Sequence, residues 1–333
     1  MKPTPKPSLR RQLGMTIVEL MISMTIGLVI LGAVGALFIN VQHSARNAES
    51  MSRIQESARF AVELMARDIR MAGFIGCSNL ETGTVNTIAK APVEPLQASN
   101  ALRGQDAPSG TIAGITLVGG DTIAIKRGTG RDVYLVDTPS ATEIKINRNP
   151  EIPYNFVSGD VLLVSNCTHA DVFRVTNDPS VGSSITIEHG EDANDGFRIG
   201  NYGQDAFVMR LARYVYFVGT NPDTNRPSLY RANTIAGAGV AEELVDNVES
   251  MEIEYGIDTT PNNDNNAADE YRTAATVANW ESVISVRLRL LVASADNNIL
   301  PAAQSHTFNG TTVSDRRMRQ VFTTTIAIRN RLP

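Results

Sequence analysis

The chain has 333 residues, of which 42% are hydrophobic and 20% charged, and its formal net charge is −5. This is ordinary globular composition, with enough length for one large domain or two small ones. Because no cluster of Lys or Arg appears beyond residue 20, the net negative charge argues against a nucleic-acid-binding surface.

An apolar segment follows the basic N-terminus. Residues 15–39, MTIVELMISMTIGLVILGAVGALFI, contain a single charged residue, Glu19. About 20 apolar residues are enough to span the hydrocarbon layer of a bilayer. Four cationic residues precede the segment, so the positive-inside rule predicts a cytoplasmic N-terminus. No convincing signal-peptidase site follows residue 39, so we expect the segment to stay attached to the rest of the chain.

Beyond residue 39 the apolar pattern changes from all-round to one-sided, with spacings of three and four. The stripe consists of Val41, Ala45, Ala48, Met51, Ile54, Ala58, Ala61, Met65, Ile69 and Ala72. No proline occurs between residues 15 and 91, and Gly73 and Gly76 favour a helix end. The pattern predicts one continuous helix, a rod of roughly 90 Å at 1.5 Å per residue.

The chain has two cysteines, Cys77 and Cys167, and both follow the apolar segment. If the N-terminus is cytoplasmic, both thiols lie on the outer side of the membrane, which in a Gram-negative periplasm is oxidising. We therefore predict a disulfide between them. The alternative is a pair of buried free thiols.

The remainder of the chain is predicted to be mainly β. Residues 79–110 are rich in Pro, Gly and Asn and are expected to form a loop. From residue 111 onward, short β-branched runs bounded by Gly, Asp, Asn or Pro predict strands. The predicted strands are 121–127, 132–137, 143–147, 160–165, 171–176, 184–189, 251–258, 283–292 and 320–333, with a hairpin formed by 206–219 and 228–233. A short helix is expected at 241–250. The predicted fold class is α+β, a long N-terminal helix carrying a mainly antiparallel β-sheet head.

Strand 283–292 shows the clearest alternation in the chain. One face is expected to carry its apolar residues, Ile284, Val286, Leu288, Leu290 and Val292. On the other face, Arg287 and Arg289 are expected to pair across strands with Glu252 and Glu254.

Little in the chain predicts catalysis, a cofactor or a metal. The sequence has no G-x-S-x-G, H-E-x-x-H or P-loop motif. The histidines are scattered without ligand spacing: His43, His169, His189 and His306. The stretch KRGTGR at 126–131 is expected to be a hairpin turn with solvated charges.

Residues 258–270, DTTPNNDNNAADE, contain several oxygen donors that raise the question of calcium. The donors are Asp258, Asp264, Asp269 and Glu270. The EF-hand spacing and its closing glutamate are absent, so we expect a polar loop rather than a calcium site.

Three N-terminal features together resemble the class III signal of type IV pilins and type II secretion pseudopilins. They are a short basic leader ending in Gly14, the sequence MTIVELMIS with glutamate fifth after the glycine, and the long apolar helix. The resemblance implies that a prepilin peptidase cleaves after Gly14 and methylates the new N-terminal residue, Met15. Family members usually have phenylalanine at this position, so Met15 is a departure.

The same resemblance implies an assembly role for Glu19. Cleavage creates an α-amine at Met15, and Glu19 lies one helical turn further on the same face. In the family, the corresponding glutamate pairs with the α-amine of a neighbouring subunit and sets its axial register. The alternative is an intrachain pair together with attraction to the helix N-terminal dipole.

Parts of the head resemble minor pilins of the PilW family, and the general layout is similar to the pseudopilin GspJ. The segments that carry this resemblance are 56–77, 158–176, 244–258 and 323–333. It implies a leader at 1–14, a transmembrane and filament-core helix at 15–39, a periplasmic amphipathic half of that helix at 40–76, and a head at 77–333.

The resemblance also implies a function and partners. A minor pilin anchors in the inner membrane by a single span, with its head in the periplasm, then enters the filament and primes assembly at or near the tip. The implied partners are other minor pilins, the major pilin, a tip adhesin, the prepilin peptidase and the inner-membrane assembly platform. The alternatives are a type II secretion pseudopilin and, less favoured, a signal-anchored periplasmic binding module or enzyme.

Overall fold

The computed structural model describes residues 16–77, 80, 83–147, 156–179, 184–196, 199–260 and 267–331. The chain divides into two units, Met1–Ser50 and Met51–Pro333.

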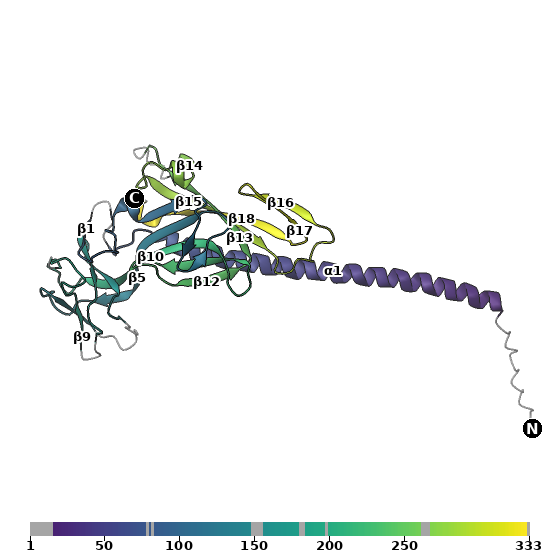
Figure 1. Ribbon diagram of the computed structural model, residues 1–333, viewed down its shortest axis with the longest axis horizontal. Coiled ribbons are helices and arrows are strands. Elements are labelled where there is room, and N and C mark those ends of the chain that lie inside the picture. The colour runs from purple at the N-terminus through teal and green to yellow at the C-terminus, as the bar shows by residue number, and fades with distance from the viewer. Residues whose placement is uncertain are drawn as a thin grey trace, which may run out of the picture. The chain divides into compact units, whose positions relative to one another are not determined.

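Helix α1 (Ile17–Arg70) is the one long helix among the described residues (Figure 1). It confirms the predicted continuous helix, although it ends at Arg70 rather than at Gly73. Gly73 and Gly76 follow with φ angles of +75° and +106°, a conformation that glycine adopts without strain and that ends a helix. By length and composition α1 is able to cross a membrane.

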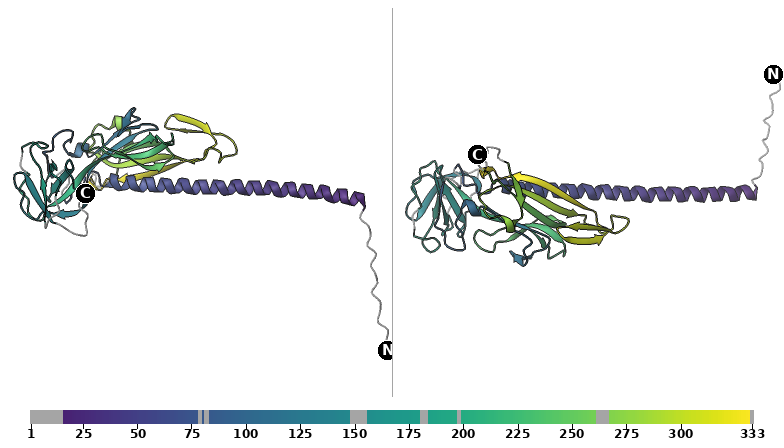
Figure 2. Two further views of the ribbon diagram at one scale, coloured as in Figure 1. Left: turned by 60° about the horizontal axis from the view of Figure 1, so that its bottom comes forward. Right: turned by 90° about the horizontal axis from the view of Figure 1, so that it is seen from above.

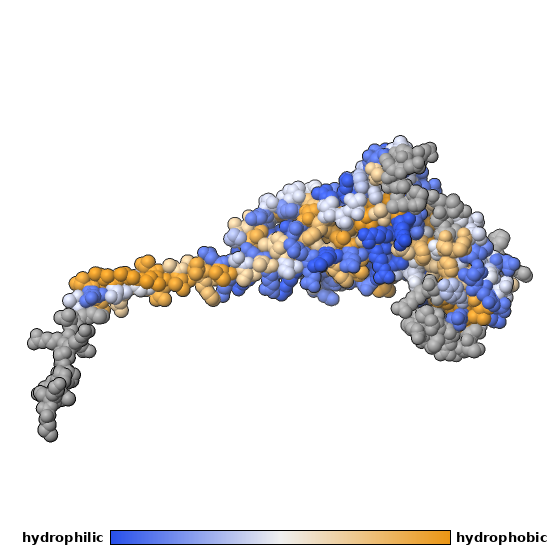
Figure 3. All heavy atoms as spheres, turned by 180° about the vertical axis from the view of Figure 1, so that it is seen from behind, coloured by the Kyte–Doolittle hydropathy of each residue, from blue (hydrophilic) through white to orange (hydrophobic). Residues whose placement is uncertain are grey.

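Residues 17–39 of α1, in the first unit, are mainly apolar and exposed. Orange spheres predominate there in Figure 3, and Ile17, Val29 and Leu31 expose 80%, 72% and 69% of their surface. Soluble surfaces rarely expose a continuous apolar patch of this kind. Exposed apolar side chains of this kind are typical of a helix that contacts a lipid bilayer or neighbouring helices.

The larger sheet of the second unit has eight strands in the order β1-β8-β7-β10-β11-β12, with β5 pairing with both β10 and β2. All the pairs are antiparallel except β1 with β8. The strands are β1 (Thr84–Thr87), β2 (Leu102–Gln105), β5 (Thr122–Tyr134), β7 (Val161–Ser165), β8 (His169–Arg174), β10 (Phe207–Thr220), β11 (Pro227–Asn233) and β12 (Ala241–Asp246).

A second, antiparallel sheet has the order β14-β13-β15-β18. Its strands are β13 (Val248–Ile257), β14 (Glu270–Arg272), β15 (Val283–Ala293) and β18 (Arg319–Ala327). Three two-stranded pairs and three short 3₁₀ helices complete the described part of the head: β3 (Thr111–Ile112) with β4 (Ile115–Thr116), β6 (Glu143–Asn147) with β9 (Ser184–Glu188), β16 (Gln304–Phe308) with β17 (Thr311–Asp315), and η1 (Ala98–Asn100), η2 (Ala274–Thr276) and η3 (Arg329–Arg331). The mainly antiparallel β head on a helix confirms the predicted fold class.

The main core lies where the C-terminal part of α1 packs on strands of both sheets (Figure 2). From α1 and the turn after it, the stripe predicted from the sequence contributes Ile54, Ala58, Ala61, Met65, Ile69 and Ala72, all at most 2% exposed. Opposite them lie residues such as Ile123 and Ile125 of β5, Met251 of β13 and Leu288 of β15. A separate core fills the lobe built by β6, β7, β8 and β9.

The predicted helix at 241–250 is wrong. These residues form β12 and the start of β13, joined at Asn247, whose φ of +56° turns the chain. Asn tolerates this left-handed conformation better than most residues. The segment contains good helix formers, but pairing with β11 and β15 overrides the local preference.

Two further expectations also fail. Residues 79–110 are not only loop, because β1, η1 and β2 lie within them. The stretch 126–131 is not a hairpin turn but the middle of the long strand β5. There the side chain of Lys126 is only 2% exposed, so its charge is not solvated.

Strand β15 follows the predicted alternation except at its start. A bulge against β13 pairs Ile257 with Val283 and Gly256 with Ser285, so Ile284 is the extra residue. Val283 consequently joins the main core with Val286, and Ile284 does not.

Candidate functional site

The N-terminus of α1 carries the predicted assembly residue, Glu19. Thr16 precedes the helix, and its Oγ1 accepts a hydrogen bond from the Glu19 backbone N–H at 3.3 Å. Thr followed three residues later by Glu is the capping-box sequence, which satisfies backbone donors at a helix start. The predicted processing residues, Gly14 and Met15, lie outside the described residues.

The Glu19 side chain is exposed, and no ion pair joins it to a cation among the described residues. The hydroxyls near it are satisfied by the helix itself: Ser23 Oγ donates to the Glu19 carbonyl at 2.7 Å, and Thr25 Oγ1 to the Ile22 carbonyl at 2.8 Å. Because such bonds remove the need for water, these hydroxyls are compatible with an apolar environment. The carboxylate of Glu19 is thus the one acidic group of the first turn and is open to an external cation.

A buried charge cluster joins α1 to the larger sheet. Asp68 is 2% exposed. Its Oδ1 accepts from Arg127 Nη2 of β5 at 2.5 Å, and its Oδ2 accepts from the Tyr216 hydroxyl of β10 at 2.6 Å. Arg231 of β11 adds a longer ion pair, with Nη1 3.8 Å from Oδ2. These partners offset the free-energy cost of removing the carboxylate from water, which is large for a buried charge without partners.

Neighbouring groups hold this cluster in place. The guanidinium carbons of Arg127 and Arg231 lie 5.5 and 4.7 Å from the centre of the Tyr214 ring, within the range of cation–π attraction. Burial and then the charge of Asp68 raise the pKa of Tyr216 above its ordinary value. The phenol therefore keeps its proton and remains a donor. The cluster fixes the C-terminal end of α1 on the sheet.

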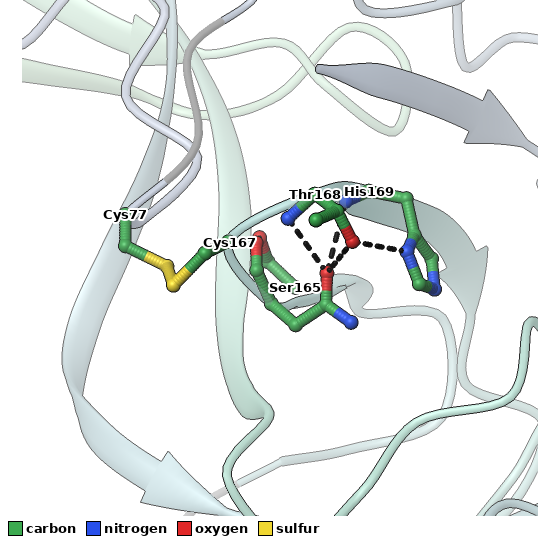
Figure 4. The surroundings of a disulfide bond; sticks show 6 residues. Cys77, Ser165, Cys167, Thr168 and His169 are labelled. Carbon is green, nitrogen blue, oxygen red and sulfur yellow. Dashed lines mark hydrogen bonds between the residues drawn. A yellow bond between two sulfur atoms is a disulfide. The ribbon is translucent and has the colours of Figure 1, made fainter.

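The predicted disulfide between Cys77 and Cys167 is present, with a Cα–Cα distance of 4.9 Å (Figure 4). It ties the segment just after α1 to the turn between β7 and β8. Gly76 allows the backbone beside Cys77 to lie close to Phe207, because a Cβ on residue 76 would lie 2.0 Å from the Phe207 ring.

The turn that carries Cys167 is held by one side chain. Asn166 Oδ1 accepts hydrogen bonds from the Thr168 N–H, the Thr168 hydroxyl and the His169 N–H, each at 2.9 Å. Thr168 Oγ1 also lies 2.9 Å from His169 Nδ1, and a dashed line marks this contact in Figure 4. The disulfide thus links the segment after α1 to a turn that the Asn166 side chain holds.

The predicted cross-strand ion pairs are confirmed. Glu252 is paired with Arg289 at 2.6 Å, and Glu254 with Arg287 at 3.1 Å. All four side chains are between 27% and 39% exposed, so these pairs belong to the outer face of the second sheet.

The segment 258–270 is only partly described, because 261–266, including Asp264, lies outside the described residues. Asp269 Oδ2 accepts from the Thr259 N–H and hydroxyl, both at 2.8 Å. Across the described residues, no group of three or more His, Cys, Asp or Glu is arranged to hold a metal ion.

Sequence reasoning missed the Asp68 cluster. One signal was available: Asp68 lies three residues after Met65 and next to Ile69, on the apolar side of the helical stripe, where a carboxylate needs a partner. The partners could not be identified from the sequence, because Arg127 and Tyr216 are 59 and 148 residues away along the chain.

Two family models match separate parts of the chain. Residues 9–35 match the prokaryotic N-terminal methylation motif, and residues 215–330 match the Type IV Pilus-assembly protein W family, PilW. The second match covers the end of β10 and every later strand, and so includes the whole second sheet.

A curated relative is also similar, the Pilin-like protein PilA3 of Thermus thermophilus. It is 30% identical over 87 residues, which are 26% of this chain and 36% of the relative, so the match spans about a third of the relative's length. No solved structure matches the chain.

A methylation motif at the start of a long exposed apolar helix, joined to a β-rich head, is the arrangement expected of a pilin-class protein. The match over 215–330 is more specific and, with the pilin-like relative, supports a minor pilin of the type IV pilus, of the PilW type.

Proposed function

We propose that the chain is a structural minor pilin that primes type IV pilus assembly and is incorporated at or near the filament tip. The observation that carries the proposal is the succession, in one chain, of a methylation motif at 9–35, an exposed apolar helix and a PilW match at 215–330. The PilW match favours a pilus subunit over a type II secretion pseudopilin. The function is mechanical rather than catalytic.

In this proposal the segments of the chain have successive roles. Residues 1–14 are the leader, removed by the prepilin peptidase after Gly14, and Met15 becomes the mature N-terminus. Residues 15–39 hold the protein in the inner membrane with the head, 77–333, in the periplasm, and residues 40–76 continue the helix into that head. On assembly, the apolar helix exchanges lipid for the helices of other pilins, which explains its exposed side chains.

Glu19 is the proposed assembly residue. After cleavage, the α-amine of Met15 in one subunit and the carboxylate of Glu19 in its neighbour form an ion pair in a medium of low dielectric constant, where a pair depends strongly on geometry. The proposed partners are other minor pilins, the major pilin, a tip adhesin and the inner-membrane assembly platform.

The test is the mass and N-terminal sequence of the protein from membranes of its native host, compared with the same host lacking its prepilin peptidase. We expect a chain beginning at Met15 in the first strain, with or without one added methyl group, and a chain beginning at Met1 in the second. A chain beginning at Met1 in both strains would refute the proposal and favour an ordinary signal-anchored periplasmic protein.

A further inference from the structure

A groove of about 1150 Å³ lies on the larger sheet, over Thr122 and Ala124 of β5 and Val215 of β10. Successive side chains of a strand point to opposite faces. Ile123 and Ile125, which alternate with Ala124, pack in the core that contains α1. The groove therefore opens on the face of the sheet that is turned away from the helix.

Two arginines, Arg103 of β2 and Arg213 of β10, line this groove. Arg103 is exposed and Arg213 is half-buried, and no ion pair joins either of them to an acidic side chain among the described residues. Arg213 Nη1 donates to Thr234 Oγ1 at 2.7 Å, which fixes its side chain against the groove wall. The Arg103 guanidinium carbon lies 5.3 Å from the centre of the Trp280 ring.

A buried lysine adds a third cation. Lys126 Nζ is 2.8 Å from Glu94 Oε2, and the Glu94 side chain, on the groove wall, is 63% exposed. The hydrogen bond and charge of Lys126, followed by the charges of Arg213 and Arg103, lower the pKa of Glu94. Three cations thus act on a single carboxylate, on a chain whose net charge is −5. Because Lys126 and Glu94 neutralise each other, the charges of Arg103 and Arg213 leave the groove with a net positive charge, and a concave site of one net sign attracts ligands of the other.

The dimensions and lining of the groove narrow the class of ligand. Pockets for small molecules usually have volumes of roughly 300 to 1000 Å³. At about 1150 Å³ this groove exceeds that range, and the Thr122, Ala124 and Val215 side chains of its floor carry no charge that would fix a single small anion. We propose that the groove binds an extended acidic peptide segment of a partner protein, whose carboxylates pair with Arg103 and Arg213. This inference does not depend on the proposed function.

The test uses the full-length chain in detergent micelles and a synthetic peptide of alternating glutamate and serine, with a lysine–serine peptide of the same length as the comparison. Isothermal titration calorimetry gives the affinity. Trp280 is the only tryptophan, so a change in its fluorescence reports on Arg103 when the peptide binds. The variant is Arg103→Gln/Arg213→Gln. Its control, Lys145→Gln/Arg272→Gln, removes the same charge from residues that do not line the groove.

We expect the acidic peptide to bind the wild type and the control alike, and the groove variant at least about tenfold more weakly, with an affinity that falls as salt is raised. The lysine–serine peptide should not bind. Equal binding to the groove variant, an equal loss in the control, or citrate binding as tightly as the peptide would overturn the proposal. Thermal unfolding checks that the double variant folds. If it does not, Arg213→Gln alone provides the comparison, with the Trp280 signal as the readout.

Discussion

One helix, α1, lies in two different environments. In residues 17–50 the large apolar side chains are exposed, and hydroxyls such as that of Ser23 bond to the helix's own carbonyls. In residues 51–70 most of the apolar residues form a buried stripe, and Asp68 bonds to side chains of the larger sheet. The helix is continuous through both environments, so the helix propensity of its residues is enough to explain where it runs. The distribution of apolar residues around its axis decides whether the chain itself or an outside partner covers it.

The largest effect is expected at Glu19, where the change should affect assembly and leave the head intact. We expect Glu19→Ala to reduce incorporation into pili more than about tenfold, because the α-amine of the neighbouring subunit would lose its partner in a low-dielectric medium. The melting temperature of the protein should stay the same. Immunoblots of sheared pili and thermal unfolding in detergent measure the two quantities. Glu56→Ala, at an exposed position of the same helix, is the matched control.

Glu19→Gln separates the proposed ion pair of Glu19 from its place in the capping-box sequence. Glutamine keeps the capping-box pattern with Thr16 but removes the charge. If the ion pair matters, the Gln variant should fail as the Ala variant does. Normal assembly of Glu19→Gln would show instead that capping is the role of this residue.

The disulfide should give the largest effect on the stability of the second unit. It closes a loop with a sequence separation of 90 residues, which in the chain-entropy model corresponds to about 4 to 5 kcal/mol. Cys77→Ser/Cys167→Ser should lower the free energy of unfolding by this order, measured by urea titration under oxidising conditions. Addition of a reductant should destabilise the wild type and leave the double variant unchanged. A double variant as stable as the wild type would mean that the disulfide does not constrain the unfolded chain.

Asp68→Ala should have the next largest effect, lowering the free energy of unfolding by about 3 kcal/mol or more. The substitution leaves Arg127 with no carboxylate at its buried end and removes the acceptor of the Tyr216 hydroxyl. Glu63→Ala, at an exposed position on the same part of α1, should change stability by less than about 0.5 kcal/mol. Similar losses in the two variants, by urea titration followed by circular dichroism, would contradict a specific role for the cluster.

The elements that the sequence predicted correctly depend on periodicity, and those it missed depend on contacts distant in the chain. The stripe from Ile54 to Ala72 and the pairs of Glu252 and Glu254 follow from spacings that a single segment reveals. The charges of Lys126 and Arg127 were expected to be solvated because nothing near them in sequence pairs with them. Their actual partners are Glu94 for Lys126 and Asp68 for Arg127, in segments that only the folded chain brings close.

A smaller, pH-dependent effect is expected at Asp315. Two hydrogen bonds from Arg319, whose side chain is only 4% exposed, hold the pKa of Asp315 at about 2, below its ordinary 3.8. Because the folded-state pKa is depressed, the pair stabilises the protein fully above the unfolded-state value, and this stability is lost as the pH falls toward 2. Asp315→Asn should lower the free energy of unfolding by about 1 to 2 kcal/mol at neutral pH, after allowance for partial exposure, and by almost nothing near pH 2. Urea titrations across this pH range test it; a difference independent of pH would exclude titration of Asp315 as its cause.

The smallest effect is expected on the outer face of the second sheet, where Glu252 and Arg289 are 27% and 39% exposed. A double-mutant cycle with Glu252→Ala, Arg289→Ala and the double variant should give a coupling energy of about 0.3 to 1 kcal/mol, because solvent screens the pair. Arg289→Ala alone should cost more than Glu252→Ala, since its guanidinium also lies 5.3 Å from the centre of the Phe308 ring. The contrast with Asp68 is one of burial, because both carboxylates accept a bond from an arginine at a similar distance. A coupling energy as large as the Asp68 effect would mean that this face is not solvated in solution, and would require a partner that covers it.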